Sequence, residues 1–232
     1  MELAIGRGFE SLQVRMKADI HIHTDRDPID GLLGKNIVDY SPIMLINEAA
    51  KKGFTHISLT HHKKIFFNNA LKNYALSKGI FLIPGVEASI EGKDVVLLNP
   101  SREIKTFKEL LDEKRSNKEL FVLAPHPFYP SPSSLNKELI DYIDLFDAIE
   151  ISFFNHFFVN YFNKKAIKIA KKYDKPLITT SDSHKLENFG HNYIVSKEKD
   201  LFKAIKKRDY ETVTKKMSFY DLIKSLVNFF LS

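Results

Sequence analysis

The sequence predicts an α/β protein whose parallel strands close into a barrel. Short apolar runs alternate about seven times with helical stretches, and this alternation is typical of a parallel sheet covered by helices. No glycine-rich fingerprint follows the first apolar run, so a closed barrel is favoured over an open dinucleotide-binding sheet. The length of 232 residues fits one domain, or one domain with a small appendage.

The predicted strands are short apolar segments separated by helical stretches. They cover residues 18–22, 57–59, 81–83, 95–98, 120–124, 148–151 and 177–180. One helix is predicted to begin at Ser41-Pro42, a capping residue followed by a first-turn proline, and to run to Lys52, with Gly53 as its stop. A second helix is predicted for residues 162–173, where apolar side chains recur at helical spacing.

Three parts of the chain are distinguished. Residues 17–196 carry the alternating pattern and form the predicted barrel. Residues 1–16 are expected to be an extension that is poorly ordered, or an over-called start. Residues 197–232 are predicted as a C-terminal helical segment, because apolar side chains recur at roughly helical spacing in residues 218–230. That segment is expected to pack on the barrel or on a second copy of the chain, which would form a homo-oligomer; a membrane-surface role is the alternative.

The composition is that of a soluble globular protein, with 44% hydrophobic and 28% charged residues and no apolar run long enough to cross a membrane. The N-terminus lacks the pattern of a signal peptide, which favours the cytoplasm. The absence of cysteine excludes disulfides and thiolate ligands. The net charge of +6 comes mainly from lysines scattered over predicted helices, so solvated helix faces explain most of it; a nucleic-acid surface is the alternative.

Histidine and carboxylate side chains fall just past the ends of the predicted strands. In chain order they are His21 and His23, His61 and His62, Glu87, His126, and Asp182 and His184. The carboxyl ends of parallel barrel strands converge on one rim, where the catalytic residues of such barrels lie. Residues far apart in the sequence are therefore expected to meet in one cleft.

Two pairs of these residues share a spacing of two. His21 and His23 point to the same side of a strand, so both can donate a ring nitrogen to one ion. Asp182 and His184 repeat this geometry with a carboxylate and an imidazole. A single strand histidine is more often structural than a ligand. Two such pairs on the first and last strands, which are neighbours in a closed barrel, favour a metal site.

Mixed imidazole and carboxylate ligation suits zinc, iron or manganese. Glu87 could bridge two ions because a carboxylate has two oxygens. Water held between such ions becomes hydroxide near neutral pH and can attack phosphorus, while the cations screen the charge on the phosphoryl oxygens. The site therefore predicts a metal-dependent hydrolase that needs no protein nucleophile.

Five motifs occur in an order that resembles the polymerase and histidinol phosphatase (PHP) domain superfamily, in particular its stand-alone metal-dependent phosphoesterases. They are Asp19-Ile-His21-Ile-His23-Thr24, Thr60-His61-His62, Gly85-Val86-Glu87, Pro125-His126-Pro127 and Ser181-Asp182-Ser183-His184. The resemblance extends from about Lys17 to Gly190, which is most of the chain. It also includes Ile149-Glu150 and Asn155 after the sixth strand.

The resemblance implies a distorted seven-stranded, TIM-like β/α barrel with two or three divalent metal ions (zinc, manganese or iron) in the rim cleft. It assigns His21, His23, Glu87 and Asp182 to the first ion, Glu87 and His126 to the second, and His62, His184 and an early aspartate to the third. Glu87, Asp182 and His126 would act in catalysis as ligands of the metal ions that activate the hydroxide.

Three positions depart from the pattern of the superfamily or leave a choice open. His61 stands where relatives often have aspartate, and we expect it beside the ligands, with a role as an extra ligand as the alternative. Asp30 is the best match for the early aspartate, and Asp25 and Asp27 are the alternatives. Asn99 follows the fourth strand where some relatives have histidine, so the second ion is expected to be weakly bound or absent.

Further residues next to the motifs are candidates for supporting roles. Glu150 and Asn155 are expected to support the ligands from outside the metal centre. Four basic residues are candidates for gripping a phosphate, and each can equally be an ordinary surface charge: Arg26, Lys63, Lys64 and Lys185.

Three functions are compatible with such a site. The leading hypothesis is hydrolysis of a phosphorylated small molecule. A nuclease or exonuclease acting on short nucleic acids is the second, and the isoelectric point near 9.2 favours it. The third is a non-catalytic barrel subunit of a nucleic-acid-processing complex. The presence of nearly all ligand types argues against this third function.

Overall fold

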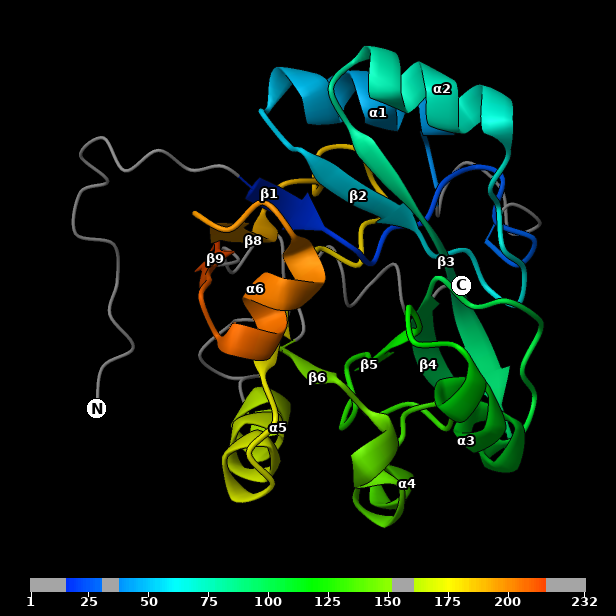
Figure 1. Ribbon diagram of the computed structural model, residues 1–232, viewed down its shortest axis with the longest axis vertical. Coiled ribbons are helices and arrows are strands. Elements are labelled where there is room, and N and C mark those ends of the chain that lie inside the picture. The colour runs from blue at the N-terminus through cyan, green and yellow to red at the C-terminus, as the bar shows by residue number, and fades with distance from the viewer. Residues whose placement is uncertain (1–15, 31–37, 152–160, 216–232) are drawn as a thin grey trace.

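The computed structural model describes residues 16–30, 38–151 and 161–215, in which nine strands form one sheet (Figure 1). The strands are β1 (Met16–Asp19), β2 (His56–Leu59), β3 (Phe81–Ile90), β4 (Lys93–Leu98), β5 (Phe121–Ala124), β6 (Ala148–Ile151), β7 (Leu177–Thr179), β8 (Asn192–Ser196) and β9 (Glu211–Thr214). The helices are α1 (Pro42–Lys51), α2 (Asn69–Ser77), α3 (Phe107–Ser116), α4 (Lys137–Asp141), the 3₁₀ helix η1 (Ile143–Leu145), α5 (Tyr161–Lys172) and α6 (Leu201–Lys207). The predictions for residues 1–15 and 218–230 lie outside the described ranges.

The sheet curls into a nearly closed barrel, which confirms the predicted fold class. Its strand order is β7-β6-β5-β4-β3-β2-β1-β8-β9, and β7 at one edge lies beside β8 and β9 at the other. At the rim, Ile22 after β1 forms a parallel bridge with Ser183 after β7. The His23 amide donates a hydrogen bond to the Ser183 carbonyl at 3.0 Å. The ends of the first and seventh strands are therefore neighbours, as predicted.

The direction of β4 differs from the all-parallel prediction. The strands β1, β2 and β3 are mutually parallel, as are β5, β6 and β7, but β4 runs antiparallel to β3 and β5. Only Glu91 and Gly92 separate β3 from β4, with φ angles of 51° and 79°. Positive φ at both central residues belongs to the tight turn that joins antiparallel strands. The strand predicted for residues 81–83 therefore extends to Ile90 and reverses.

The sheet continues past residue 196, where the sequence predicted the end of the barrel. Antiparallel β8 pairs with β1, and β9 pairs with β8. The short helix α6 connects these two strands. The described part of residues 197–232 thus contains a helix and an edge strand rather than helix alone.

The predicted helices at residues 42–52 and 162–173 are confirmed as α1 and α5. The Ser41 side chain accepts a hydrogen bond from the Met44 amide, and Pro42 occupies the first turn of α1. Gly53 follows its end with a φ of 71°. None of the helices in the described ranges has the length and apolar character needed to cross a membrane.

Apolar side chains are buried on both faces of the barrel strands. This packing fixes the positions of the strand ends that form the rim. One buried cluster takes residues from both halves of the curved sheet, together with Leu201 and Ala204 of α6. A second cluster packs β2 against α1 and α2, which lie together beside that strand in Figure 1, and a third packs β4 to β6 against α3 and α5. The rim therefore stands on strands that are buried on both sides.

Gly85 lies in β3, two residues before Glu87, where the backbone approaches β2 closely. A Cβ at this position would overlap the Ser58 hydroxyl and would lie 3.0 Å from Leu98 Cδ2 and Thr60 Cγ2. The absence of a side chain at Gly85 thus lets β3 pair with β2 and sets the position of Glu87.

Gly85→Ala should lower the free energy of unfolding by about 1–3 kcal/mol, because overpacking forces β3 away from β2. Adding Ser58→Ala should recover part of the loss, since it removes the most severe overlap. Urea unfolding of both variants and of Ser58→Ala alone tests this. Wild-type stability in Gly85→Ala would show that the strands tolerate a side chain here.

Candidate metal centre

The predicted ligands from β1, β2, β3, β5 and β7 converge at the rim of the barrel. The side chains of His21 and His23 are fully buried, and the Glu87 side chain is 3% exposed. The groups whose ligand atoms lie within 4.8 Å of one another are His21-His23-Glu87, His21-His126-Asp182, His23-Asp182-His184, Glu87-Asp94-His126 and His23-Asp27-Asp30-His62. Residues from five separate motifs therefore form one continuous cluster.

The first ligand set consists of His21, His23, Glu87 and Asp182. Nε2 of His21 lies 3.4 Å from Glu87 Oε2 and 3.4 Å from Asp182 Oδ1. Nε2 of His23 lies 3.3 Å and 3.4 Å from the same two oxygens. Ligands bound to one ion at about 2.0–2.1 Å in a tetrahedron are separated by roughly 3.3–3.4 Å. These four distances match those between the ligands of a tetrahedral metal site.

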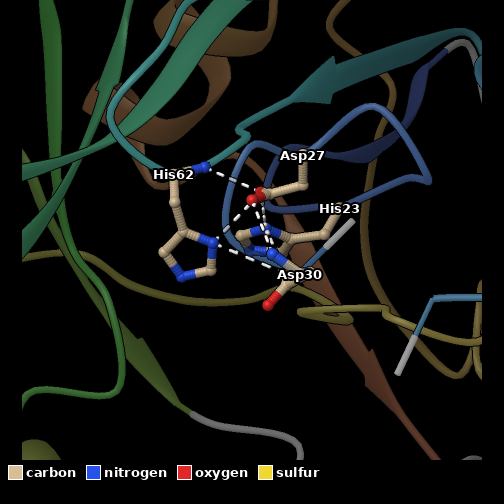
Figure 2. A group of neighbouring side chains, drawn as sticks. All are labelled: His23, Asp27, Asp30 and His62. Atoms are coloured by element: carbon tan, nitrogen blue, oxygen red, sulfur yellow. Dashed lines mark hydrogen bonds and ion pairs between the residues drawn. The ribbon is translucent and has the colours of Figure 1, made fainter. Parts of the chain in front are cut away.

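The two histidines of this set are oriented from behind by carboxylates. Nδ1 of His21 lies 3.0 Å from Glu150 Oε1, and Nδ1 of His23 lies 2.9 Å from Asp27 Oδ2. Figure 2 shows Asp27 between His23 and His62, whose Nδ1 is 3.0 Å from the same oxygen. A carboxylate that accepts from Nδ1 leaves the lone pair of Nε2 directed at the cluster. The supporting position predicted for Glu150 agrees with this geometry.

Glu87 faces two sides of the cluster with its two oxygens. Oε2 contacts the first ligand set and also Nε2 of His62 at 3.3 Å, whereas Oε1 lies 3.3 Å from Nε2 of His126. Asp182 behaves similarly, because its Oδ2 lies 3.9 Å from the same His126 nitrogen. This arrangement allows Glu87 to bridge a first and a second ion.

Asn99, the predicted partner at the second ion, lies away from the cluster. Because β4 is antiparallel, its C-terminal residue Leu98 pairs with Gly85, below the level of Glu87. The Asn99 side chain donates to the carbonyl of Glu119 before β5. The expectation that Asn99 lies beside the second ion is therefore wrong.

Asp94, which the sequence did not single out, takes the place expected for Asn99. It lies at the start of β4 and groups with Glu87 and His126. The signal that could have revealed it is the Glu91-Gly92 pair, which marks a two-residue hairpin turn.

A third ligand set is centred on Asp30. Its Oδ2 lies 3.0 Å from His184 Nε2, and 3.5 Å from Nδ1 of both His62 and His23. Of the three early aspartates, Asp30 is therefore the one that lies beside both His62 and His184. Asp27 supports the neighbouring histidines instead, and Asp25 is exposed and pairs with Arg26 at 3.7 Å.

The carboxylates of the cluster raise the pKa values of His21 and His126 and so favour their protonated forms. Burial disfavours the charged imidazole of His126, but Glu87 and Asp182 outweigh it and raise its pKa to about 9. Burial likewise opposes protonation of His21, yet Asp182, Glu150 and Glu87 hold its pKa well above the usual value. Burial would raise the pKa of Glu87, but the histidines around it keep that pKa well below its usual range. Divalent ions can supply this positive charge in place of protons.

Several buried atoms of the cluster have no hydrogen-bond partner, which fits a metal centre. They are Nε2 of His21, Nε2 of His23, Oε1 of Glu87 and Oδ2 of Asp30. Buried polar atoms are normally paired, because an unpaired one costs about 1–3 kcal/mol. These unpaired atoms face one another, and they are nitrogen and oxygen donors of the types that zinc, iron and manganese accept. Together they have the properties of a set of metal ligands.

Two of the candidate ligands have unusual backbone conformations. His126 has a φ of 25° and Asp182 a φ of 45°, in a region that residues other than glycine rarely adopt. Such conformations cost on the order of 1 kcal/mol or more each and persist where surrounding structure enforces them. Here the His126 amide donates to Glu150 Oε2 at 2.7 Å. The backbone strain is consistent with a functional demand on the two side chains.

The remaining predicted residues lie at different places. Nε2 of His61 lies 2.8 Å from the Thr24 hydroxyl, and His61 belongs to none of the ligand groups in the described part of the chain, as expected for a supporting residue. Lys63 and Lys64 are exposed beside the rim, and the Lys63 amide donates to the Glu87 carbonyl at 2.9 Å. Lys185 Nζ lies 3.8 Å from Asp39 Oδ2. Asn155 lies outside the described residues.

Comparison with known proteins supports the predicted family resemblance. The PHP-associated family model (PHP_C) matches residues 160–210, whereas no curated protein matches the chain. This match agrees with the five motifs around the cluster and supports the predicted resemblance to the PHP domain superfamily.

Three solved structures share the fold. PsfC from Pseudomonas syringae PB-5123 superposes with a TM-score of 0.62 at 15% identity, over 95% of this chain and all of that chain. The lesion-specific endonuclease PfuEndoQ from Pyrococcus furiosus gives 0.56 at 17% identity, over 85% of this chain and 57% of its own. A protein from Bifidobacterium adolescentis classed as a metal-dependent phosphoesterase gives 0.52 at 13% identity, over 72% and 87%. Likeness at these identities establishes a common fold.

Glu150→Gln and Asp27→Asn should each weaken metal binding by about 10–100-fold, because each removes the charge that orients a histidine. Competition of the purified variants with a chromophoric chelator measures the affinity. Glu138→Gln, a half-exposed carboxylate on α4, is the matched control and should bind metal as the wild type does. Wild-type affinity in both test variants would mean that these carboxylates do not support a metal centre.

Proposed function

We propose that the chain is a metal-dependent hydrolase that cleaves the phosphoester bond of a phosphorylated small molecule. The observation that carries this proposal is the continuous cluster of histidines and carboxylates around Glu87. Its donor types and spacing suit two or three divalent ions, with zinc, manganese and iron as the candidates. The resemblance to the PHP superfamily supports the same assignment.

Divalent ions in such a site lower the pKa of water and neutralise charge on a phosphoryl group. The residues of the chain have complementary roles in this proposal. Glu87 and Asp182 each present one oxygen to the first ligand set and the other toward His126, so they hold two neighbouring positions together. His21 and His23 are fully buried, which shields their side of the site from solvent. Hydrolysis then needs no nucleophile from the protein.

Basic residues beside the rim are proposed to bind the phosphate group of the substrate. Lys63 and Lys64 are the best placed, because they are exposed and Lys63 follows His62 directly and contacts the Glu87 backbone. Arg26 is exposed as well, with a loose contact to Asp25. Lys185 is a weaker candidate, since its ammonium group lies near Asp39.

A nuclease acting on short nucleic acids is the second candidate function. The isoelectric point of about 9.2 and the fold shared with a lesion-specific endonuclease favour it. The chain spans only 57% of the length of that endonuclease. The comparison therefore supports a shared barrel fold and does not extend the activity of the whole endonuclease to this chain. Binding of oligonucleotides that weakens steeply with salt would favour this second function, because released counterions dominate such binding.

His21→Ala and Asp182→Ala should each abolish hydrolysis by the metal-loaded protein and lower its metal content, without unfolding the barrel. We expect the wild type to turn over phosphomonoesters and to bind oligonucleotides weakly and with little salt dependence. The measurements are a panel of phosphomonoesters, phosphodiesters and oligonucleotides, elemental analysis, and circular dichroism.

The control is His56→Asn, a histidine in β2 whose ring stacks on Phe81 away from the ligand groups. It should retain both metal and activity. Unchanged activity and metal content in His21→Ala and Asp182→Ala would contradict the assignment of the site. Cleavage of oligonucleotides without turnover of monoesters would support the nuclease instead.

A further inference from the structure

The hairpin between β3 and β4 returns the chain to the metal centre. After Glu87, β3 continues for three residues, turns at Glu91 and Gly92, and pairs back so that Asp94 lies opposite Ser89. A ligand atom of Asp94 comes within 4.8 Å of those of Glu87 and His126. An antiparallel strand thus adds a carboxylate to a rim formed otherwise by the ends of parallel strands.

The position of Asp94 is defined by its surroundings. Its amide donates to the Ser133 carbonyl at 2.8 Å. The carboxylate is partly buried and lies near that of Glu87. Two carboxylates are thus held close together, and a cation between them would relieve their repulsion.

An independent observation points to a ligand between these groups. Oε1 of Glu87 is buried and has no hydrogen-bond partner, and the Glu87 side chain is 3% exposed. That oxygen lies 3.3 Å from Nε2 of His126, on the side away from the first ligand set. An unpaired buried carboxylate oxygen directed at an imidazole and a second carboxylate is the arrangement expected around a cation.

The two ligand sets differ in their donors. The first set offers two imidazole nitrogens and two carboxylate oxygens. The second offers one nitrogen, from His126, and oxygens from Glu87 and Asp94, with Asp182 Oδ2 at 3.9 Å from that nitrogen. Imidazole suits zinc, whereas oxygen donors suit manganese and magnesium.

We propose that Asp94 is a ligand of a second metal ion and makes the second site rich in oxygen donors. The first site then prefers Zn²⁺ over Mn²⁺ more strongly than the second site does. This inference rests on the metal centre of the proposed function and adds both a ligand and a metal preference. It also replaces Asn99, whose side chain is bonded to Glu119 at the other end of β4.

The experiment starts from metal-free full-length protein loaded with one equivalent of Zn²⁺ and titrated with Mn²⁺, with bound manganese followed by electron paramagnetic resonance and zinc by elemental analysis. The wild type should bind one Zn²⁺ and one Mn²⁺ in the Glu87 cluster. Asp94→Asn should keep the zinc and bind Mn²⁺ at least about tenfold more weakly. Asp94→His should keep a second ion but shift its Mn²⁺-to-Zn²⁺ selectivity at least about tenfold toward zinc, since it exchanges an oxygen for a nitrogen donor.

The matched control is Asp112→Asn, which removes an exposed carboxylate from α3 and should behave as the wild type. Wild-type Mn²⁺ affinity in Asp94→Asn would overturn the inference and leave the proposed function standing. Loss of zinc as well from Asp94→Asn would also overturn it, because Asp94 would then support the whole centre. Unchanged selectivity in Asp94→His would refute the metal preference. Absence of any bound divalent ion from the wild type would refute the proposed function itself.

Discussion

The buried carboxylate of Glu87 is the constraint on which the rest of the centre depends. Its two oxygens lie within 3.4 Å of ring nitrogens from His21, His23, His62 and His126. A buried carboxylate without compensating charge costs several kcal/mol. Neutral histidines can act as metal ligands but cannot balance that charge, so either protons or metal ions must supply it. The donor geometry favours metal ions, and this accounts for the carboxylates that orient the histidines from behind.

The barrel meets this constraint by departing from regular geometry at its rim. His126 and Asp182 adopt positive φ angles just past β5 and β7, which turns their side chains toward Glu87. Antiparallel β4 lies between the two parallel halves of the sheet, and the turn that joins it to β3 lies beyond Glu87. Gly85 allows β3 and β2 to approach closely below that level. The distortion of the barrel therefore lies where the ligands are positioned.

The sequence predicted the barrel and most of the cluster because two regular features were visible in it. Alternating strands and helices indicated the fold, and the i, i+2 pairs of His21-His23 and Asp182-His184 indicated the first ligand set. Strand direction was not visible in apolar runs, so Asn99 was placed at the rim in place of Asp94. Only the turn chemistry of Glu91-Gly92 carries that information. The strands β8 and β9, which extend the sheet beyond β1, were missed because the alternation ends before them.

The most direct test of the account is a crystal structure of the zinc-loaded protein with anomalous diffraction recorded on both sides of the zinc absorption edge. The account predicts an anomalous peak about 2.0–2.2 Å from Nε2 of His21, Nε2 of His23, Oε2 of Glu87 and Oδ1 of Asp182. A zinc-loaded crystal without a peak between these four atoms, or with zinc only at surface histidines, would contradict it.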